Sequence, residues 1–446
     1  MSPLTFRGIL AVGIRLLIAS TVAVVLGCAK HRMLMPAPAL YSSTSADLSQ
    51  ATLECRRGPT TEVLYATDRQ YQPDRGSDPY PPERERFLRL GVAEVAIGPI
   101  PPEQATWDTI ASQSGSTKRD LPIALSLASV DDFGPLAEST VPFDPVHFDP
   151  DVAEAGRRFA ELVNRRLGEA THKDIVVYVA PFKVAFDEAV LAAAEFHHFL
   201  GRDGVFIAYS WPSKEGNLSY FNAAENAYRT RRCLRVFLEY LFANTAAERV
   251  HLLTYSAGAR VLSGALHQLA LVSRHLEPAQ VAEQIRLGNV IFSSPDMDAG
   301  AFLEHAIEEV GRIPGTVTIY TSKKDGALKL SRVLYGNGRL GTLDTEDFLP
   351  QGIEFLSETN QFTFVSVMAA KGATSGNGHG YFRLSPWVST DILLMLGRNL
   401  PPAERGLFRS PGDPIWRFPE DYEDRIQAIG ASWGRSGDVP ANPPGS

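Results

Sequence analysis

The sequence predicts an α/β fold in which a mainly parallel sheet carries helices on both faces and antiparallel strands at its N-terminal edge. Three observations lead to this prediction. After about Pro150, helical patterns alternate with short apolar strands, which is the order of parallel βαβ units. These strands are apolar without interruption, as strands covered on both faces are. Before Pro150, two strand patterns are separated only by a proline-rich turn, which favours antiparallel edge strands.

The composition limits the classes of protein to which the chain can belong. It has 446 residues, of which 44% are hydrophobic and 21% charged, so it can bury a large core and is not mainly disordered. The 43 Lys and Arg residues are scattered and the net charge is −8, so nucleic acid is not an expected partner. Three cysteines cannot form a disulfide scaffold, and their spacing matches no zinc motif.

Residues 1–27 have the pattern of a signal peptide. Two arginines precede a mostly apolar run at 16–26, which is too short to cross a hydrocarbon layer of about 30 Å as a helix. A glycine and Cys28 end the run and resemble the lipobox of bacterial lipoproteins, in which the cysteine is lipidated and becomes the first residue. We therefore expect acyl chains such as palmitate on Cys28 to anchor the protein in a membrane of the bacterial cell envelope. Ala29 favours the outer membrane, facing the periplasm; the alternative is an uncleaved anchor helix.

Residues 28–59 are small and polar, with prolines and a Ser/Thr cluster, which predicts a tether between the membrane and the folded part. Cys55 lies in this segment, and Cys233 lies in a later helical pattern. In an oxidising compartment the two cysteines could form a disulfide. Cys233 also has apolar neighbours, among which a buried free thiol is common. The sequence leaves both interpretations open.

One domain is expected over residues 60–400. Its expected strands cover, in order, 63–67, 87–97, 175–179, 205–209, 250–254, 289–293, 316–321 and 362–367. Its expected helices cover 152–167, 187–200, 222–242, 259–271 and 301–310. Residues 401–446 are rich in proline, glycine and charge, which predicts a tail that is partly draped over the domain and partly disordered.

A candidate nucleophile follows the strand at 250–254. The strand leads directly into Ser256, Ala257 and Gly258, and a helical pattern begins at once. Such a turn holds a serine in a strained conformation above the sheet, and its neighbours are small because two chain segments nearly touch. Thr254 occupies a position where G-x-S-x-G has glycine, which predicts crowding. On this segment alone, Ser256 is either a nucleophile or a structural turn residue.

The partners of a catalytic serine are an imidazole that takes its proton and a carboxylate that orients the imidazole. In this fold class they follow the serine in the order acid, histidine, each on a loop after a later strand. Asp325 follows the strand at 316–321, and His379 lies between glycines after the strand at 362–367. The order therefore favours Ser256, Asp325 and His379 as a triad.

Two alternatives concern the acid. Asp325 could instead cap a helix at about 327–333, or fill both roles. Asp296 or Asp298, one strand earlier, could be the acid in its place, although this fold usually takes the acid from the penultimate strand. No metal site is expected: His197 and His198 are adjacent in a helix and point about 100° apart.

Several segments together resemble a family of bacterial α/β-hydrolases known mostly as a domain of unknown function and described as esterase- or lipase-like. The resemblance spans about residues 61–400 and rests on the order and spacing of the segments TEVLYATDR, DIVVYVAPFKVAFDEAVLAAAEFHHFLG, GVFIAYSWPS, RVHLLTYSAGARVL, SSPDMDAGAF, VTIYTSKKDGALKLSR and GHGYF. It implies the α/β-hydrolase fold, with Ser256 as nucleophile, Asp325 as acid and His379 as base.

Two segments depart from the family pattern. Members usually have H-G-[FY]-N where residues 180–183 read Ala, Pro, Phe and Lys, and A-H-S-M-G where residues 254–258 read Thr, Tyr, Ser, Ala and Gly. The first segment supplies half of the oxyanion hole. Pro181 has no N–H, so the expected backbone donors are Phe182 and Ala257.

Two functional hypotheses follow. The first is a serine hydrolase of the cell envelope that cleaves a small-molecule or lipid ester, or a related acyl substrate, through the triad. This chemistry needs water but no metal or organic cofactor. The second is a lipid-anchored binding or scaffolding protein that keeps the fold but whose altered oxyanion loop no longer supports turnover.

Overall fold

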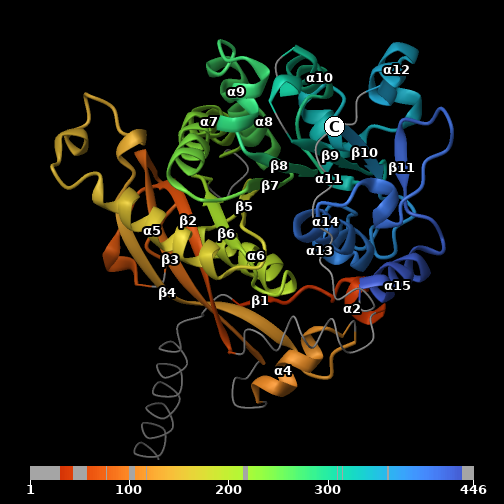
Figure 1. The fold of residues 1–446 in the computed structure, drawn as a ribbon, viewed down its shortest axis with the longest axis horizontal. Helices are drawn as coiled ribbons and strands as arrows, with labels where there is room; N and C mark the ends of the chain where they lie inside the picture. The colour runs from red at the N-terminus through yellow and green to blue at the C-terminus, as the bar shows by residue number, and fades with distance from the viewer. Residues whose placement is uncertain are drawn as a thin grey trace, which may run out of the picture.

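An eleven-stranded sheet forms the centre of the part of the chain that the structure describes (Figure 1). The structure is a computed structural model, and it describes residues 31–43, 58–76, 78–99, 106–116, 118–213, 219–308, 310–313, 315–358 and 361–433. The strand order is β1-β4-β3-β2-β6-β5-β7-β8-β9-β10-β11. The predicted α/β-hydrolase fold class is confirmed: a mainly parallel sheet with antiparallel strands at its N-terminal edge.

The sheet has two parts that meet at β2. The antiparallel part consists of β1 (Arg32–Met33), β4 (Ile123–Pro135), β3 (Arg84–Pro99) and β2 (Thr60–Arg69). On its other side β2 pairs in parallel with β6, which begins the parallel part. That part consists of β6 (Val205–Ser210), β5 (Asp174–Val179), β7 (Arg249–Tyr255), β8 (Leu287–Ser293), β9 (Thr316–Thr321), β10 (Phe362–Ser366) and β11 (Ile415–Arg417).

Helices cover both faces of the parallel part. On one face the apolar cluster includes side chains of α5 (Glu154–Glu169), α7 (Ser219–Asn244), α8 (Gly258–Val272) and α10 (Ala299–Glu308). On the other face it includes side chains of α6 (Phe186–Phe199), α13 (Tyr381–Leu384), α14 (Pro386–Arg398) and α15 (Tyr422–Trp433). The remaining α-helices are α2 (Ala39–Ser43), α4 (Trp107–Ser114), α9 (Pro278–Gln284), α11 (Gly326–Tyr335) and α12 (Pro350–Glu358).

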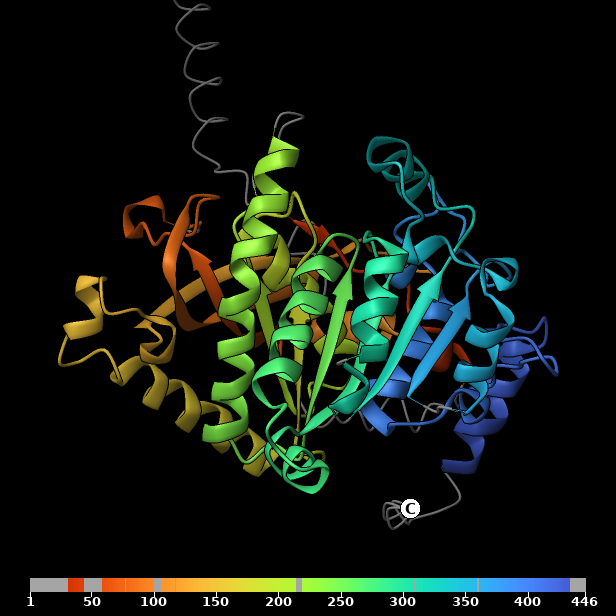
Figure 2. The same cartoon turned by 90° about the horizontal axis from the view of Figure 1, so that it is seen from above.

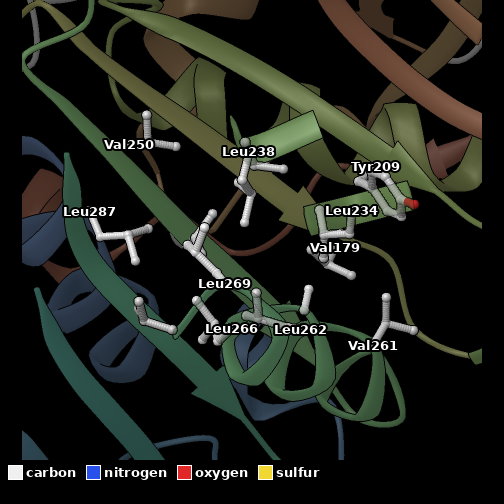
Figure 3. Packing of buried hydrophobic residues seen from close by; sticks show 14 of the residues in the cluster. Val179, Tyr209, Leu234, Leu238, Val250, Val261, Leu262, Leu266, Leu269 and Leu287 are labelled. Atoms are coloured by element: carbon white, nitrogen blue, oxygen red, sulfur yellow. The ribbon is translucent and has the colours of Figure 1, made fainter. Parts of the chain in front are cut away.

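The strands alternate their side chains between these two cores. Val177 and Val179 of β5 belong to one cluster, and Val176 and Tyr178 belong to the other. On the first face, leucines of α8 at helical spacing lie against those of α7, over the strands (Figure 3). The unbroken apolar strands in the sequence are therefore explained by burial on both faces.

Parts of the segments expected as tether and tail belong to the sheet and the core. At the start, Arg32–Met33 pairs with β4, and Leu34, Met35 and Ala37 are buried. At the end, β11 pairs in parallel with β10, and α15 packs its apolar side against the core. Both segments are short apolar stretches among prolines and polar residues, so their pattern is too brief to predict an element.

Some predictions lie outside the described residues. These include the signal peptide and lipidation at Cys28, and also Cys55, so a Cys55–Cys233 pairing is not described. Cys233 itself is a buried free thiol on α7, and burial raises its pKa to about 12. None of the helices in the described part of the chain combines the length and apolar character that a membrane-spanning helix requires.

A buried ion pair network attaches the N-terminal segment to the domain. The fully buried Glu195 carboxylate of α6 accepts hydrogen bonds from the Met35 N–H (2.6 Å) and from the Arg383 guanidinium (2.9 and 3.0 Å). Arg32 of β1 lies 3.4 Å from the same carboxylate. Burial alone would raise the pKa of Glu195, but Arg32 and Arg383 hold it below its ordinary value, so the group is ionised. Segment 32–35 is therefore held against α6 and α13.

We predict that Glu195→Ala destabilises the fold by about 3–5 kcal/mol, because it leaves Arg383 partly buried without its counter-charge. Urea-induced unfolding followed by circular dichroism measures the change. Glu154→Gln, at an exposed ion pair with Arg157, is the control and should leave the midpoint unchanged. Equal midpoints for the two variants would contradict the role of Glu195.

Candidate active site

Ser256 lies on a sharp turn between β7 and α8. Its φ is +54°, in the left-handed region that non-glycine residues rarely adopt, as predicted for this turn. Two backbone hydrogen bonds hold the conformation: the Ser256 N–H donates to the Ser293 carbonyl (3.0 Å), and the Ser256 carbonyl accepts from the Asp296 N–H (3.1 Å). The neighbouring strand β8 and the loop after it therefore fix the serine backbone.

The turn is tight enough that only glycine fits at position 258. A Cβ there would lie 2.5 Å from the Thr254 Oγ1, 2.7 Å from the Ala180 carbonyl oxygen and 2.9 Å from the Val179 carbonyl oxygen. Thr254 contributes to this crowding, as expected, and its hydroxyl donates a hydrogen bond to the Val179 carbonyl (3.1 Å). Thr254 thus joins the elbow to the end of β5.

The three side chains predicted as a triad form one hydrogen-bonded line. The His379 Nε2 lies 2.9 Å from the Ser256 Oγ, and the His379 Nδ1 lies 2.7 Å from the Asp325 Oδ2. An ionised carboxylate can only accept, so Nδ1 carries the proton and Nε2 accepts from the serine hydroxyl. Asp325 is fully buried, whereas 14% of the His379 side chain is exposed.

Asp325 combines the two roles that the sequence left open. While its Oδ2 faces His379, its Oδ1 accepts from the Leu328 N–H (3.0 Å) and caps the N-terminus of α11. The alternative acids have other partners. Asp296 forms ion pairs with Arg260 and Arg339, and Asp298 accepts from the N–H of Ala301 at the start of α10.

Residues that were not predicted from the sequence hold the His379 loop. The Ser294 hydroxyl donates to the His379 carbonyl (2.9 Å), and the Asn377 side chain accepts from the His379 N–H (3.1 Å).

Two tyrosines lie next to this loop. The Tyr255 ring centroid is 4.8 Å from the centroid of the His379 imidazole, and the Tyr381 hydroxyl donates to the Tyr320 carbonyl (2.9 Å). Burial, with Asp325 nearby, raises the pKa of Tyr255, so its hydroxyl stays neutral. Tyr255, Ser294 and Tyr381 all lie in segments that carry the family resemblance, which is the signal that could have revealed them.

The loop after β5, residues 180–184, is held through its backbone carbonyls. The Trp211 indole N–H donates to the Ala180 carbonyl (2.6 Å), and the Arg69 guanidinium and the Ser213 hydroxyl donate to the Val184 carbonyl (2.6 and 3.2 Å). Arg69 is 2% exposed, and burial lowers its pKa to about 10, so it remains a cation at neutral pH. These contacts brace a loop that lacks the histidine usual in the resembling family.

The two predicted oxyanion donors belong to the segments that meet at this turn. Ala257 is the N-cap of α8, where the first N–H groups have no intrahelical acceptor and the helix dipole is positive. Phe182 lies in the braced loop, half-buried against the apolar cluster. The next residue, Lys183, has a φ of +61°, a second strained position in the loop. No group of three or more His, Cys, Asp or Glu side chains suited to a metal ion occurs among the described residues.

The comparison with protein families agrees with this architecture. Residues 156–398, more than half of the chain, match the model of the family described as "Alpha/beta hydrolase of unknown function (DUF900)". The chain belongs to this α/β-hydrolase family. Membership supports a hydrolase-like function and leaves the substrate open.

Among solved structures, this α/β-hydrolase is similar to one described as "the putative cell surface hydrolase from Lactobacillus plantarum WCFS1". The two chains share 11% sequence identity, and the match covers 47% of this chain and 88% of the other, with a TM-score of 0.26. No curated protein matches the chain.

For this α/β-hydrolase we predict that Gly258→Ala destabilises the fold by about 1–3 kcal/mol, because the added methyl group overlaps two backbone carbonyls. Urea-induced unfolding measures the loss. Gly168→Ala in α5 is the matched control: its Cβ meets nothing within 4 Å, so stability should stay the same or rise by up to about 1 kcal/mol. A tolerated Gly258→Ala would contradict the close approach at the elbow.

Proposed function

We propose that this protein is a serine hydrolase that cleaves a carboxylic ester or a related acyl substrate. The hydrogen-bonded line Ser256–His379–Asp325 carries the proposal, because it matches the arrangement that activates a serine hydroxyl. The left-handed backbone of Ser256 and the N-terminus of α8 beside it add support, since both belong to the nucleophile elbow of this fold.

The proposed reaction has two halves. Ser256 Oγ attacks the acyl carbonyl carbon while its proton passes to His379 Nε2, and the oxyanion accepts hydrogen bonds from the N–H groups of Ala257 and Phe182. His379 then gives the proton to the departing alcohol oxygen as its bond to the acyl carbon breaks. Water attacks the acyl-enzyme in the same way and releases the acid. Asp325 stays ionised and stabilises the imidazolium.

We also propose that the reaction takes place in the bacterial cell envelope, with the protein anchored by lipid on Cys28. The support is the lipobox-like end of the apolar run. The partners proposed are therefore the membrane and a small-molecule or lipid ester substrate, with no role for nucleic acid.

A second candidate function is lipid-anchored binding or scaffolding without turnover. Its support is the replacement of the usual H-G-[FY]-N residues at 180–183. Against it stands the bracing of that loop by Trp211 and Arg69. Losing one oxyanion donor would cost about 10²- to 10³-fold in rate, so a measured turnover number separates the two functions.

We predict that a fluorophosphonate probe labels the native protein at Ser256, because the probe reacts with serines activated by a histidine. Ser256→Ala should abolish labelling and lower the kcat of ester hydrolysis by about 10⁴- to 10⁶-fold, with an unchanged circular dichroism spectrum. Ser129→Ala, on the exposed side of β4, is the control and should label normally. Labelling of native protein no stronger than that of unfolded protein would contradict an activated serine.

We predict that Cys28→Ser blocks processing or releases the protein from the membrane, because the thiol is the proposed site of acylation. Fractionation of cells grown with labelled palmitate measures both effects. Cys233→Ser, at a buried thiol, is the control and should leave the label in place. Undiminished labelling of the Cys28→Ser protein would rule out the lipobox interpretation.

A further inference from the structure

Helix α11 presents an apolar ridge to solvent. Leu330, Val333 and Leu334 are 61%, 79% and 65% exposed, and their spacing places them on one face of the helix. The opposite face holds the helix in place, since Leu328 is buried and the Ser331 hydroxyl donates to Asp296 (2.5 Å). Single exposed apolar residues are ordinary on protein surfaces, but a ridge of three on a well-anchored helix indicates a contact surface.

Three exposed cations lie on α11 or directly before it. Lys324, Lys329 and Arg332 are exposed, and α11 contains no acidic residue. In the part of the chain that the structure describes, none of these three cations forms an ion pair. The whole chain has a net charge of −8, so this local excess of positive charge is a distinct feature. Lys329 and Arg332 lie along one side of the ridge, toward the polar part of the helix. An apolar face with Lys and Arg on the adjoining polar face is the pattern of a helix that lies in the surface of an anionic lipid layer.

The position of α11 relates the ridge to the active site. The helix begins directly after Asp325, the acid of the triad. It projects beyond the arrowheads of the central parallel strands (Figure 2). Ser256 follows the end of β7 and contacts His379, so these two side chains lie at the same, carboxyl, edge of the sheet. A surface in contact with the ridge would therefore face the active-site edge of the sheet.

The start of the described chain points to the same occupant. His31 is the first described residue, and the Met33 carbonyl accepts from Arg383, four residues after His379. Cys28 precedes His31 by only three positions, a stretch of chain that reaches at most about 11 Å. Lipid attached to Cys28 would thus keep a bilayer close to the segment that contacts α13.

We propose that α11 docks on an anionic lipid surface, with Leu330, Val333 and Leu334 at the boundary of headgroups and acyl chains and with Lys324, Lys329 and Arg332 among the headgroups. A second copy of the chain is a poorer occupant, because two-fold pairing of identical ridges would bring like charges together. If the proposed hydrolase function holds, on which this extension rests, the docked helix favours ester substrates that reside in the lipid layer.

The experiment measures insertion directly and uses the full chain carrying Ser256→Ala, so that its outcome does not depend on catalysis. Val333→Trp introduces a fluorophore on the ridge. Phe143→Trp is the matched control, because Phe143 is 76% exposed between η3 (Ala137–Ser139) and η4 (Pro145–Phe148), away from α11. The probes are brominated phosphatidylcholine vesicles with and without phosphatidylglycerol, and the signal is the fluorescence that each added tryptophan contributes over the parent chain.

When phosphatidylglycerol is present, we expect the fluorescence added by Val333→Trp to shift to the blue and to be quenched by the brominated lipid. The fluorescence added by Phe143→Trp should not change. Lys329→Gln and Arg332→Gln should each reduce the insertion equilibrium about fivefold, as expected for loss of one cation at an anionic surface. Quenching no greater at position 333 than at position 143, or equal quenching without phosphatidylglycerol, would overturn the proposal. A lipid-free dimer that Leu334→Ser dissociates would also overturn it, in favour of a second copy.

Discussion

The candidate active site depends on the buried carboxylate of Asp325, which both caps helix α11 and orients His379. One oxygen accepts from the first turn of α11, and the other faces the Nδ1 of His379. A buried charge is stable only when its oxygens have hydrogen-bond partners, and here the helix and the imidazole supply them together. The orientation of His379 and the start of α11 are therefore linked through Asp325. A shift of either one would leave an oxygen of the buried carboxylate without its hydrogen-bond partner.

The loop after β5, residues 180–184, is held in place by residues outside the loop. The usual family histidine is absent at position 180, and the loop is instead held by Trp211 and Arg69, which bind its backbone carbonyls. Because these contacts are to backbone carbonyls, they do not depend on a histidine side chain at position 180. This explains how a departure from the family pattern is compatible with an ordered loop.

The sequence was sufficient to predict the parallel strands, the sharp turn at Ser256 and the meeting of three side chains, because each leaves a local pattern: an unbroken apolar run, small residues after a strand, or a glycine-rich loop. It was not sufficient for β4, whose residues alternate only partly because none of residues 126–133 is buried on either face of the strand. It also missed the support residues. Arg69 reaches a carbonyl 115 residues away, and nothing in the local pattern around either residue records such a contact.

The left-handed backbone of Ser256 restricts the chemistry that this turn can evolve. A β-branched residue is strongly disfavoured at a φ of +54°, whereas an unbranched side chain with one heavy atom beyond Cβ experiences the same strain as serine. Cysteine and aspartate, which have no branch at Cβ, are side chains with a nucleophilic atom that this backbone accommodates, whereas threonine is disfavoured by its methyl group. The turn therefore limits which side chains can occupy position 256 unless the backbone between β7 and α8 is rebuilt.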